Sequence, residues 1–293
     1  MAGILSVVGT PIGNLEDASP RVRRTLGEAD VILCEDTRVT ARLLSAFDLH
    51  VPLVRCDENV IASRVASALE RLEAGERVAF VSDAGMPGVS DPGQRLVDAA
   101  LDAGLPVEVV PGPSAVTCAV VASGLACEHF FFEGFLLRRH SAQVARLGEL
   151  AEVPGAIVCY ESPHRVAATL ASVAEVMPGR RVALVRELTK VHEEVVRNDA
   201  VALAAQIAAR GEVRGECVVV IAPPTVEELE ERRHVAASAG AAPTLEESIR
   251  EGLAAGEPKS ALAKRLAKAF SAPRAQVYDQ VVAAAQASAN GEQ

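Results

Sequence analysis

Carboxylates, a histidine and several cations stand directly after three apolar runs that are typical of buried strands. A carboxylate or an imidazole at such a place can accept a proton from a hydroxyl group, while a guanidinium or ammonium group can hold a phosphate. Strands of one sheet end at a common edge, so these side chains are expected to form the polar mouth of a cleft. The candidate bases are Asp36, Glu161, His164 and Glu187, and the candidate phosphate-binding residues are Arg38, Arg165 and Lys190.

The same residue types also cap helices and form structural ion pairs, and the sequence leaves this alternative open. His164 follows Pro163 at the expected start of a helix, a position that equally suits a structural histidine. Neither the histidines nor the cysteines have the spacing of a metal site. The sequence therefore predicts no metal and does not choose among the four candidate bases.

The segment Val81–Ala100 joins a strand end, a loop rich in glycine and proline, and the start of a helix. The apolar run at 78–81 predicts a buried strand, and Asp91 followed by Pro92 predicts the cap and first residue of the helix. The glycines between them allow backbone angles and close approaches that a β-carbon would prevent. A rigid loop at the carboxyl end of a strand is where α/β sheets bind their ligands.

Further segments of the same character recur along the chain. They are Val7-Val-Gly-Thr-Pro-Ile-Gly-Asn-Leu15, Cys34-Glu-Asp-Thr-Arg38, Val110-Pro-Gly-Pro-Ser-Ala115, Glu133-Gly-Phe-Leu136, Tyr160-Glu-Ser-Pro-His-Arg165 and Arg186-Glu-Leu-Thr-Lys190. With the loop after Val81, this set closely resembles the bacterial 2'-O-ribose methyltransferases I of small-subunit ribosomal RNA. That family lies within the tetrapyrrole methylase superfamily, the class III methyltransferases that use S-adenosylmethionine. The resemblance extends from about Ser6 to Ile221.

The resemblance implies that S-adenosylmethionine binds in a cleft between two α/β domains and methylates a cytidine of 16S ribosomal RNA. It also implies a homodimer, with 16S rRNA or the small ribosomal subunit as partner. Methyl transfer from a sulfonium to a hydroxyl group is an in-line displacement, so positioning supplies most of the acceleration and a base only accepts the proton. The implied cofactor-binding residues are Thr10, Pro11, Asp83, Ala84, Gly85, Met86, Ser114 and Ala115, with Tyr160 and the strand near 218–220 around the adenine.

Two residues depart from the usual pattern of the family. Met86 stands where the family commonly has threonine, which removes one side-chain hydrogen bond but leaves the backbone contacts with the cofactor. Leu137 stands where the family commonly has proline after Gly-Phe-Leu, which predicts a less constrained loop.

The composition is that of a globular enzyme. The chain has 293 residues, of which 49% are hydrophobic, and a net charge of −10. This charge argues against a uniformly basic surface, so any RNA contact must come from local patches. The cysteines are widely spaced, and Cys34, Cys159 and Cys217 stand in or beside apolar runs, which favours buried thiols in a reducing compartment. No apolar stretch approaches the roughly 20 residues of a membrane helix, and no signal peptide is recognised, so we expect a cytoplasmic protein.

Strands alternate with helices from the first residues, which predicts an α/β fold. The first domain, residues 1–115, is expected to have strands at 4–8, 31–34, 78–81 and 107–110 and helices at 20–28, 37–46, 59–74 and 92–103. The second, 116–224, follows a helix at 113–123. Its strands are expected at 130–133, 156–160, 181–185, 194–197 and 216–221, and its helices at 141–151, 164–176 and 199–209. Some of these strands have no helix between them, so the second sheet is predicted to be mixed.

Residues 225–243 read as a linker, and residues 244–287 as a small domain with two amphipathic helices of the helix-turn-helix kind. Between Pro258 and Ala275 there are five cations and no acid. The residues expected to contact RNA phosphates are Lys264, Arg265 and Lys268. A solvated basic face on a helical cap is the alternative.

Three functions remain open: a methyltransferase of ribosomal RNA, a methyltransferase of the same superfamily acting on a tetrapyrrole, and a non-catalytic RNA-binding protein on a methylase fold. A tetrapyrrole enzyme has no need of a basic tail. A non-catalytic relative is expected to have lost the cofactor loops, all of which are present here. An oxidoreductase that binds a dinucleotide is disfavoured because no Gly-x-Gly-x-x-Gly follows the first strand.

Overall fold

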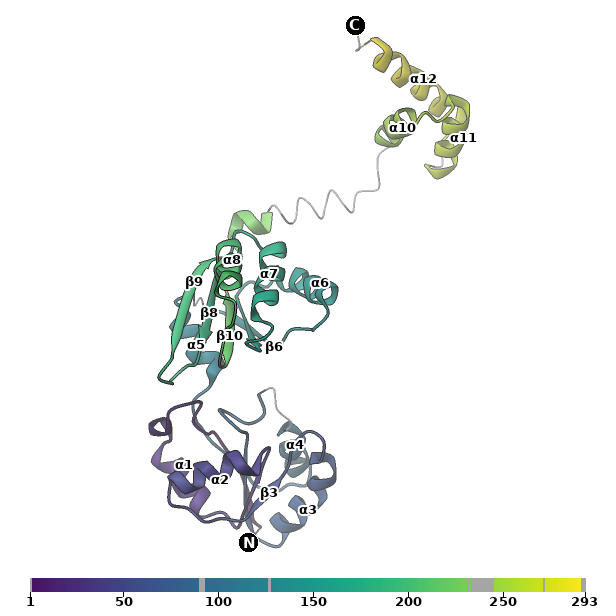
Figure 1. Cartoon of the computed structure of the whole chain (residues 1–293). Helices are drawn as coiled ribbons and strands as arrows, with labels where there is room; N and C mark the ends of the chain where they lie inside the picture. Colours follow the sequence, from purple (N-terminus) through teal and green to yellow (C-terminus); the bar gives the residue numbers. More distant parts are fainter. Residues whose placement is uncertain are drawn as a thin grey trace. The chain divides into compact units, whose positions relative to one another are not determined.

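The structure, a computed structural model, describes residues 2–89, 93–125, 128–230, 232, 245–270 and 272–290. The chain forms two compact units, Met1–Pro224 and Thr225–Gln293 (Figure 1). The first unit holds two five-stranded sheets, and the described secondary structure of the second unit is helical. The fold is therefore α/β with two sheet domains and a small C-terminal helical domain, as predicted.

The first sheet is parallel throughout, with the strand order β3-β2-β4-β1-β5. Its strands are almost wholly apolar because helices cover both faces. The neighbours β1 and β4 lie at its centre, so the loops that follow them emerge side by side at the carboxyl edge. The strands are β1 (Ile4–Val8), β2 (Val31–Cys34), β3 (Leu53–Arg55), β4 (Arg77–Val81) and β5 (Val107–Val110).

Two pairs of helices cover the first sheet. On one face, α1 (Pro20–Gly27) and α2 (Thr37–Ala46) pack through Val22, Leu26 and Leu44. On the other face lie α3 (Ile61–Glu73) and α4 (Gln94–Asp102) (Figure 1). They pack around the fully buried Phe80 of β4. The start of α1 is the one that the sequence predicts. Ser19 caps this helix by accepting the N–H of Val22 at 3.2 Å, and proline is its first residue.

The second sheet is mixed, with the order β6-β7-β10-β8-β9. The pair β6–β7 is parallel and the other pairs are antiparallel, which confirms the prediction made from strands without helices between them. The strands are β6 (Phe130–Phe135), β7 (Ala156–Glu161), β8 (Arg181–Arg186), β9 (Glu194–Asp199) and β10 (Cys217–Ile221).

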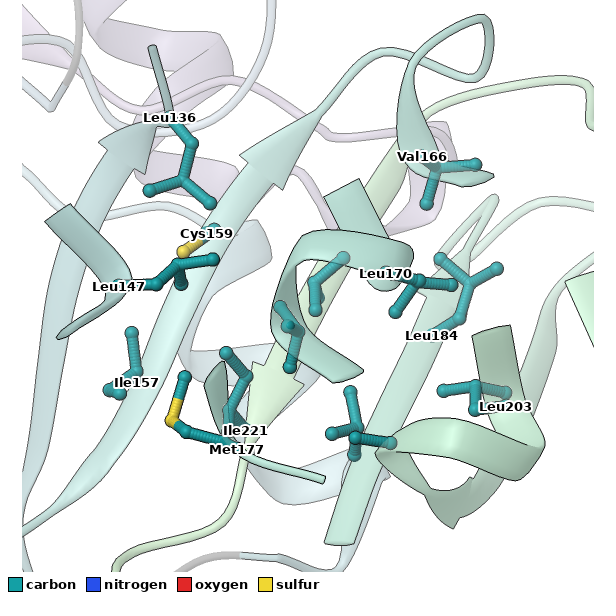
Figure 2. Packing of buried hydrophobic residues seen from close by; sticks show 14 of the residues in the cluster. Leu136, Leu147, Ile157, Cys159, Val166, Leu170, Met177, Leu184, Leu203 and Ile221 are labelled. Atoms are coloured by element: carbon teal, nitrogen blue, oxygen red, sulfur yellow. The ribbon is translucent and has the colours of Figure 1, made fainter. Parts of the chain in front are cut away.

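The two faces of the second sheet are covered unequally. On one face, α6 (His140–Leu150), α7 (Val166–Val176) and α8 (Ala200–Arg210) enclose a large apolar core that includes Leu170 and Met177 (Figure 2). The other face is covered by α5 (Ala115–Ser123). Ile12, from the loop after β1, is buried in the apolar core between α5 and the second sheet, so this loop packs against the second sheet.

The C-terminal unit contains α10 (Leu245–Ala254), α11 (Lys259–Ala269) and α12 (Arg274–Asn290), which pack around Ile249, Leu262, Leu266 and Val281. The sequence predicted two of these helices. The described part of the predicted linker is helical at 226–230, and its remainder at 233–243 lies outside the described residues.

The sequence also missed β3, a three-residue strand at the edge of its sheet. The predicted helix start at Asp91 and Pro92 lies outside the described residues, and α4 is described from Gln94. The remaining predicted domain boundaries stay predictions. Within the part of the chain that is described, no helix is long and apolar enough to span a membrane.

Candidate functional site

The loops after the central strands of the first sheet are joined by their backbones. Thr10, after β1, exchanges two hydrogen bonds with Gly85, after β4: the Thr10 N–H donates at 2.9 Å and the Gly85 N–H donates at 3.1 Å. Gly85 has a φ of +82°, a left-handed angle that glycine adopts without strain. The buried Thr10 hydroxyl also donates to the Ser82 carbonyl at 3.5 Å.

The loop after β5 meets the same junction at a close approach between two glycines. A β-carbon on Gly9 would lie 2.6 Å from the Gly112 nitrogen and 2.5 Å from the Met86 sulfur. The Gly112 N–H donates to the Met86 sulfur at 3.2 Å. Met86 therefore ties the three loops together through its thioether.

These loops and the second sheet enclose a pocket of about 420 Å³, within the size range of small-molecule sites. Its lining is mostly apolar. Six predicted cofactor-binding residues line it: Ala84, Gly85, Met86, Ser114, Ala115 and Tyr160, together with Glu161 and Val218. The sequence missed the remaining lining residues, which are Ile12, Val89, Phe135, Ser162, Pro163, Gly215, Glu216 and Cys217.

The other three predicted cofactor-binding residues, Thr10, Pro11 and Asp83, line a smaller pocket of about 250 Å³. Successive residues of the same two loops therefore line the two pockets. The Asp83 carboxylate accepts the Asp36 N–H at 3.0 Å. Partial burial, and then the neighbouring Asp36 charge, raise the pKa of Asp83. Arg42 of α2, which the sequence did not single out, also lines this smaller pocket.

Asp36, the first candidate base, is a helix cap. Its carboxylate accepts the Arg38 N–H at 2.8 Å and binds the Arg38 guanidinium at 2.6 Å. These bonds hold the pKa of Asp36 far below its usual range. The same contacts occupy Arg38, a predicted phosphate-binding residue whose side chain is 85% exposed.

Glu161, the second candidate base, is completely buried and held on both oxygens. One oxygen accepts the Ser162 N–H at 2.8 Å, and the other accepts the Thr169 hydroxyl at 2.6 Å. Arg165 lies 3.4 Å from the second oxygen and donates to the Leu136 carbonyl at 2.8 Å. Glu161 and Arg165 thus position the Ser162–Pro163 wall of the main pocket.

Glu187, the third candidate base, accepts the Glu216 N–H and the Lys190 ammonium group, both at 2.9 Å. The bond from Glu216 is the main cause of a lowered pKa of Glu187. Glu187 and Thr189 have left-handed φ angles of 53° and 64°. This loop packs against the loop after β1, because a β-carbon on Gly13 would lie 2.5 Å from the Lys190 Cγ.

The backbone at Gly215 requires glycine, and this signal is present in the sequence. The φ of Gly215 is +84°, and a β-carbon there would lie 2.3 Å from the Glu187 carboxyl group. The Arg-Gly-Glu-Cys segment before β10 therefore needs glycine to enter the wall of the pocket.

His164 is exposed beside the pocket wall, and its backbone N–H donates to the Ser162 hydroxyl at 3.3 Å. Of the cations predicted for RNA in the C-terminal unit, Lys264 and Lys268 are exposed, while Arg265 forms an ion pair with Glu257 at 2.7 Å.

The described part of the chain shows no cluster of metal ligands. It contains no group of three or more histidine, cysteine or acidic side chains that could hold a metal ion. Cys34, Cys159 and Cys217 are buried free thiols, as predicted, and burial raises the pKa of Cys159 to about 12.

Comparisons with known proteins agree with this architecture. The family model of the Tetrapyrrole (Corrin/Porphyrin) Methylases matches residues 5–204. Ribosomal RNA small subunit methyltransferase I of Mycobacterium tuberculosis is 48% identical over 224 residues, which cover 75% of this chain and 78% of that protein. The protein of the same name in Synechocystis sp. is 37% identical over 277 residues, covering 94% of this chain and 96% of that protein.

Solved structures share the fold. The methyltransferase CobJ matches with a TM-score of 0.58 at 24% identity, covering 76% of this chain and 95% of that chain. Uroporphyrin-III C-methyl transferase from Thermus thermophilus, in complex with S-adenyl homocysteine, matches with a TM-score of 0.54 at 22% identity, covering 75% and 97%. The chain therefore belongs to the tetrapyrrole methylases and, within them, to the family of ribosomal RNA small subunit methyltransferase I.

Proposed function

We propose that this protein transfers a methyl group from S-adenosylmethionine to the ribose 2'-hydroxyl group of a cytidine in 16S ribosomal RNA. The observation that carries the proposal is the main pocket, because the predicted cofactor loops of the first sheet converge there. The relatives at 37% and 48% identity, whose name states methylation of small-subunit ribosomal RNA, support this choice of acceptor.

The residues of the pocket suit S-adenosylmethionine, which supplies an electrophilic methyl group when bound. Small residues of the loops, Gly85, Ser114 and Ala115, let an adenosine-sized ligand approach the backbone, and Tyr160 and Val218 form an apolar wall opposite. Asp83, one residue before Ala84 of the main pocket, offers a carboxylate to the amino group of the methionine part.

Positioning supplies most of the proposed rate enhancement, because an in-line displacement needs little chemistry from the protein. Three of the four candidate bases already hold backbone and side-chain groups: Asp36, Glu161 and Glu187. His164 is exposed, and its neighbour Pro163 lines the pocket. We therefore assign the acceptance of the ribose proton to His164, whose imidazole can act as a general base.

The predicted phosphate-binding residues Arg38, Arg165 and Lys190 are all in ion pairs, which leaves them less available to RNA. Lys264 and Lys268, one turn apart on the exposed side of α11, are better placed. We expect replacing both with alanine to flatten the salt dependence of subunit binding by about two phosphate contacts. Arg265→Ala serves as the comparison and is expected to change the slope less, because Glu257 already neutralises Arg265.

A homodimer and a cytoplasmic location complete the proposal. Large apolar side chains are exposed on the side of the second sheet that α5 covers, with Val121 77% and Phe130 45% exposed. A second copy of the chain would shield such side chains from water. Light scattering at micromolar concentration is expected to give twice the mass of one 30.6 kDa chain. The mass of a single chain would contradict the proposed homodimer.

Mapping of ribose methylation by mass spectrometry tests the proposed reaction. Small subunits from a strain that lacks the gene are incubated with purified protein and S-adenosylmethionine. One new 2'-O-methylcytidine in 16S rRNA is expected, and it should be absent with His164→Ala. Methylation of a uroporphyrinogen or precorrin instead would establish the tetrapyrrole alternative, and no transfer to either would favour a non-catalytic RNA-binding protein.

A further inference from the structure

Strand β6 contains an irregularity that redirects its last residue. Phe132 pairs with Val158 and Phe135 pairs with Tyr160. Three steps along β6 therefore correspond to only two steps along β7. In a regular strand, residues three apart point to opposite faces of the sheet. The extra residue, Glu133, therefore places Phe135 on the same face as Phe132 and Tyr160. Both phenylalanine rings contact the Tyr160 ring, with centroids at 4.9 and 5.7 Å.

This bulge is firmly held. The Glu133 carboxylate receives two hydrogen bonds from the Arg146 guanidinium of α6, at 2.7 and 2.8 Å. Gly134 has a φ of +77°, a left-handed angle that favours glycine. The Glu-Gly-Phe-Leu motif thus specifies a fixed structure whose result is the position of Phe135. Bulges commonly redirect side chains beside functional sites.

Phe135 lines the main pocket and is nevertheless 58% exposed. Burial of such a ring stabilises a protein, so leaving it open to water forgoes stability unless the ring meets a ligand. Leu137, two residues further, is 57% exposed. Phe135 and Leu137 therefore form an apolar lip at the mouth of the pocket.

The lip continues into a basic segment. Arg138 and Arg139 follow directly and are exposed, and neither has an acidic partner among the described residues. The sequence has no aspartate or glutamate between Gly134 and Gly148. By contrast, Arg38, Arg165 and Lys190 are already paired with carboxylates.

We propose that this lip binds the acceptor nucleotide: Phe135 stacks on its unpaired base, and Arg138 and Arg139 contact the adjacent phosphates. The inference rests on the proposed ribosomal RNA methylation and assigns its acceptor side. An exposed aromatic ring next to unpaired cations is the usual combination for a single-stranded nucleotide, because every base has a face that can stack. Stacking at the pocket mouth would also bring the ribose of that nucleotide toward the methyl donor.

The test compares variants of the full-length protein in methyl transfer to small subunits, with cofactor affinity measured separately by calorimetry. Phe135→Ala is expected to lower kcat/KM for the RNA about tenfold, the typical effect of one lost stacking contact, and to leave cofactor affinity unchanged. Phe135→Tyr retains an aromatic face and is expected to stay within about threefold of wild type. Phe131→Ala is the matched control, because this ring is 39% exposed on the same strand and does not line the pocket.

The cations are tested by replacing Arg138 and Arg139 together with alanine. The salt dependence of RNA binding is expected to fall by about two phosphate contacts, with cofactor affinity again unchanged. If Phe135→Ala weakens the cofactor and leaves RNA affinity intact, Phe135 belongs to the cofactor site and the inference is wrong. Wild-type kinetics in both sets of variants would also overturn it. A wild-type protein that methylates no ribosomal RNA would instead refute the proposed function, and the inference with it.

Discussion

The two sheets contribute to the main pocket in different ways. The first sheet contributes glycines and small residues, whose backbones contact one another at Thr10 and Gly85 and at Gly9 and Gly112. The second sheet contributes larger side chains, such as Tyr160 and Glu161, held by internal contacts. One half of the pocket is therefore fixed by the close approach of backbones, and the other half by a network of polar side chains. Substitutions in the two halves of the pocket should therefore impair the protein for different reasons.

The network around Glu161 should give the largest effect on stability. Glu161→Ala leaves Thr169, Arg165 and the Ser162 N–H without their acceptor in a buried place. We expect a loss of about 3 kcal/mol in the free energy of unfolding, measured in urea. Glu161→Gln keeps one acceptor oxygen and should lose about half as much. A loss below about 0.5 kcal/mol for the alanine variant would contradict the account of a side-chain framework.

The backbone contact at Gly9 should dominate cofactor affinity. In Gly9→Ala the new β-carbon would meet Gly112 at 2.6 Å, so the loops after β1 and β5 must separate. We expect affinity for S-adenosylmethionine to fall about 100-fold, because displacement of binding groups by about 1 Å has effects of that order. Gly148→Ala in α6 is the control, since nothing lies within 4 Å of its β-carbon position. Equal affinity in both variants would show that the close approach is dispensable.

A smaller effect, dependent on pH, is expected at the edge of the second sheet. Glu194 of β9 is held by Arg210 at 2.9 Å and Arg186 at 2.7 Å, and these bonds lower the pKa of Glu194 from 4.5 to about 2. The folded-state pKa is below the unfolded value, so this stabilisation is complete above pH 4.5 and is lost as the pH falls toward 2.

Glu194→Gln should therefore cost about 1 to 2 kcal/mol at pH 7, a value reduced by solvent screening of a partly exposed pair. The cost should vanish on acidification, as urea unfolding of both proteins across pH would measure. A difference that is constant from pH 7 to pH 3 would mean that the two arginines do not stabilise the charged form.

The sequence predicted the fold better than the roles of its charged residues. Apolar runs and caps such as Ser19 located nearly all strands and helices, because burial and capping depend on local patterns. Pairing across the chain has no local pattern. Glu187 is occupied by the Glu216 N–H, which lies 29 positions away, and Glu161 by Thr169 inside a core. Phe135 was overlooked as a pocket residue because its orientation depends on the bulge at Glu133.

Titration of the protein with S-adenosylmethionine by calorimetry tests the central claim most directly, namely that the loops of the first sheet bind the cofactor. We predict one site per chain, and about tenfold weaker binding in Asp83→Ala, which removes a carboxylate contact with the amino group. Binding that is absent from the wild-type protein would contradict the proposed site. Affinity unchanged by the substitution would remove Asp83 from it.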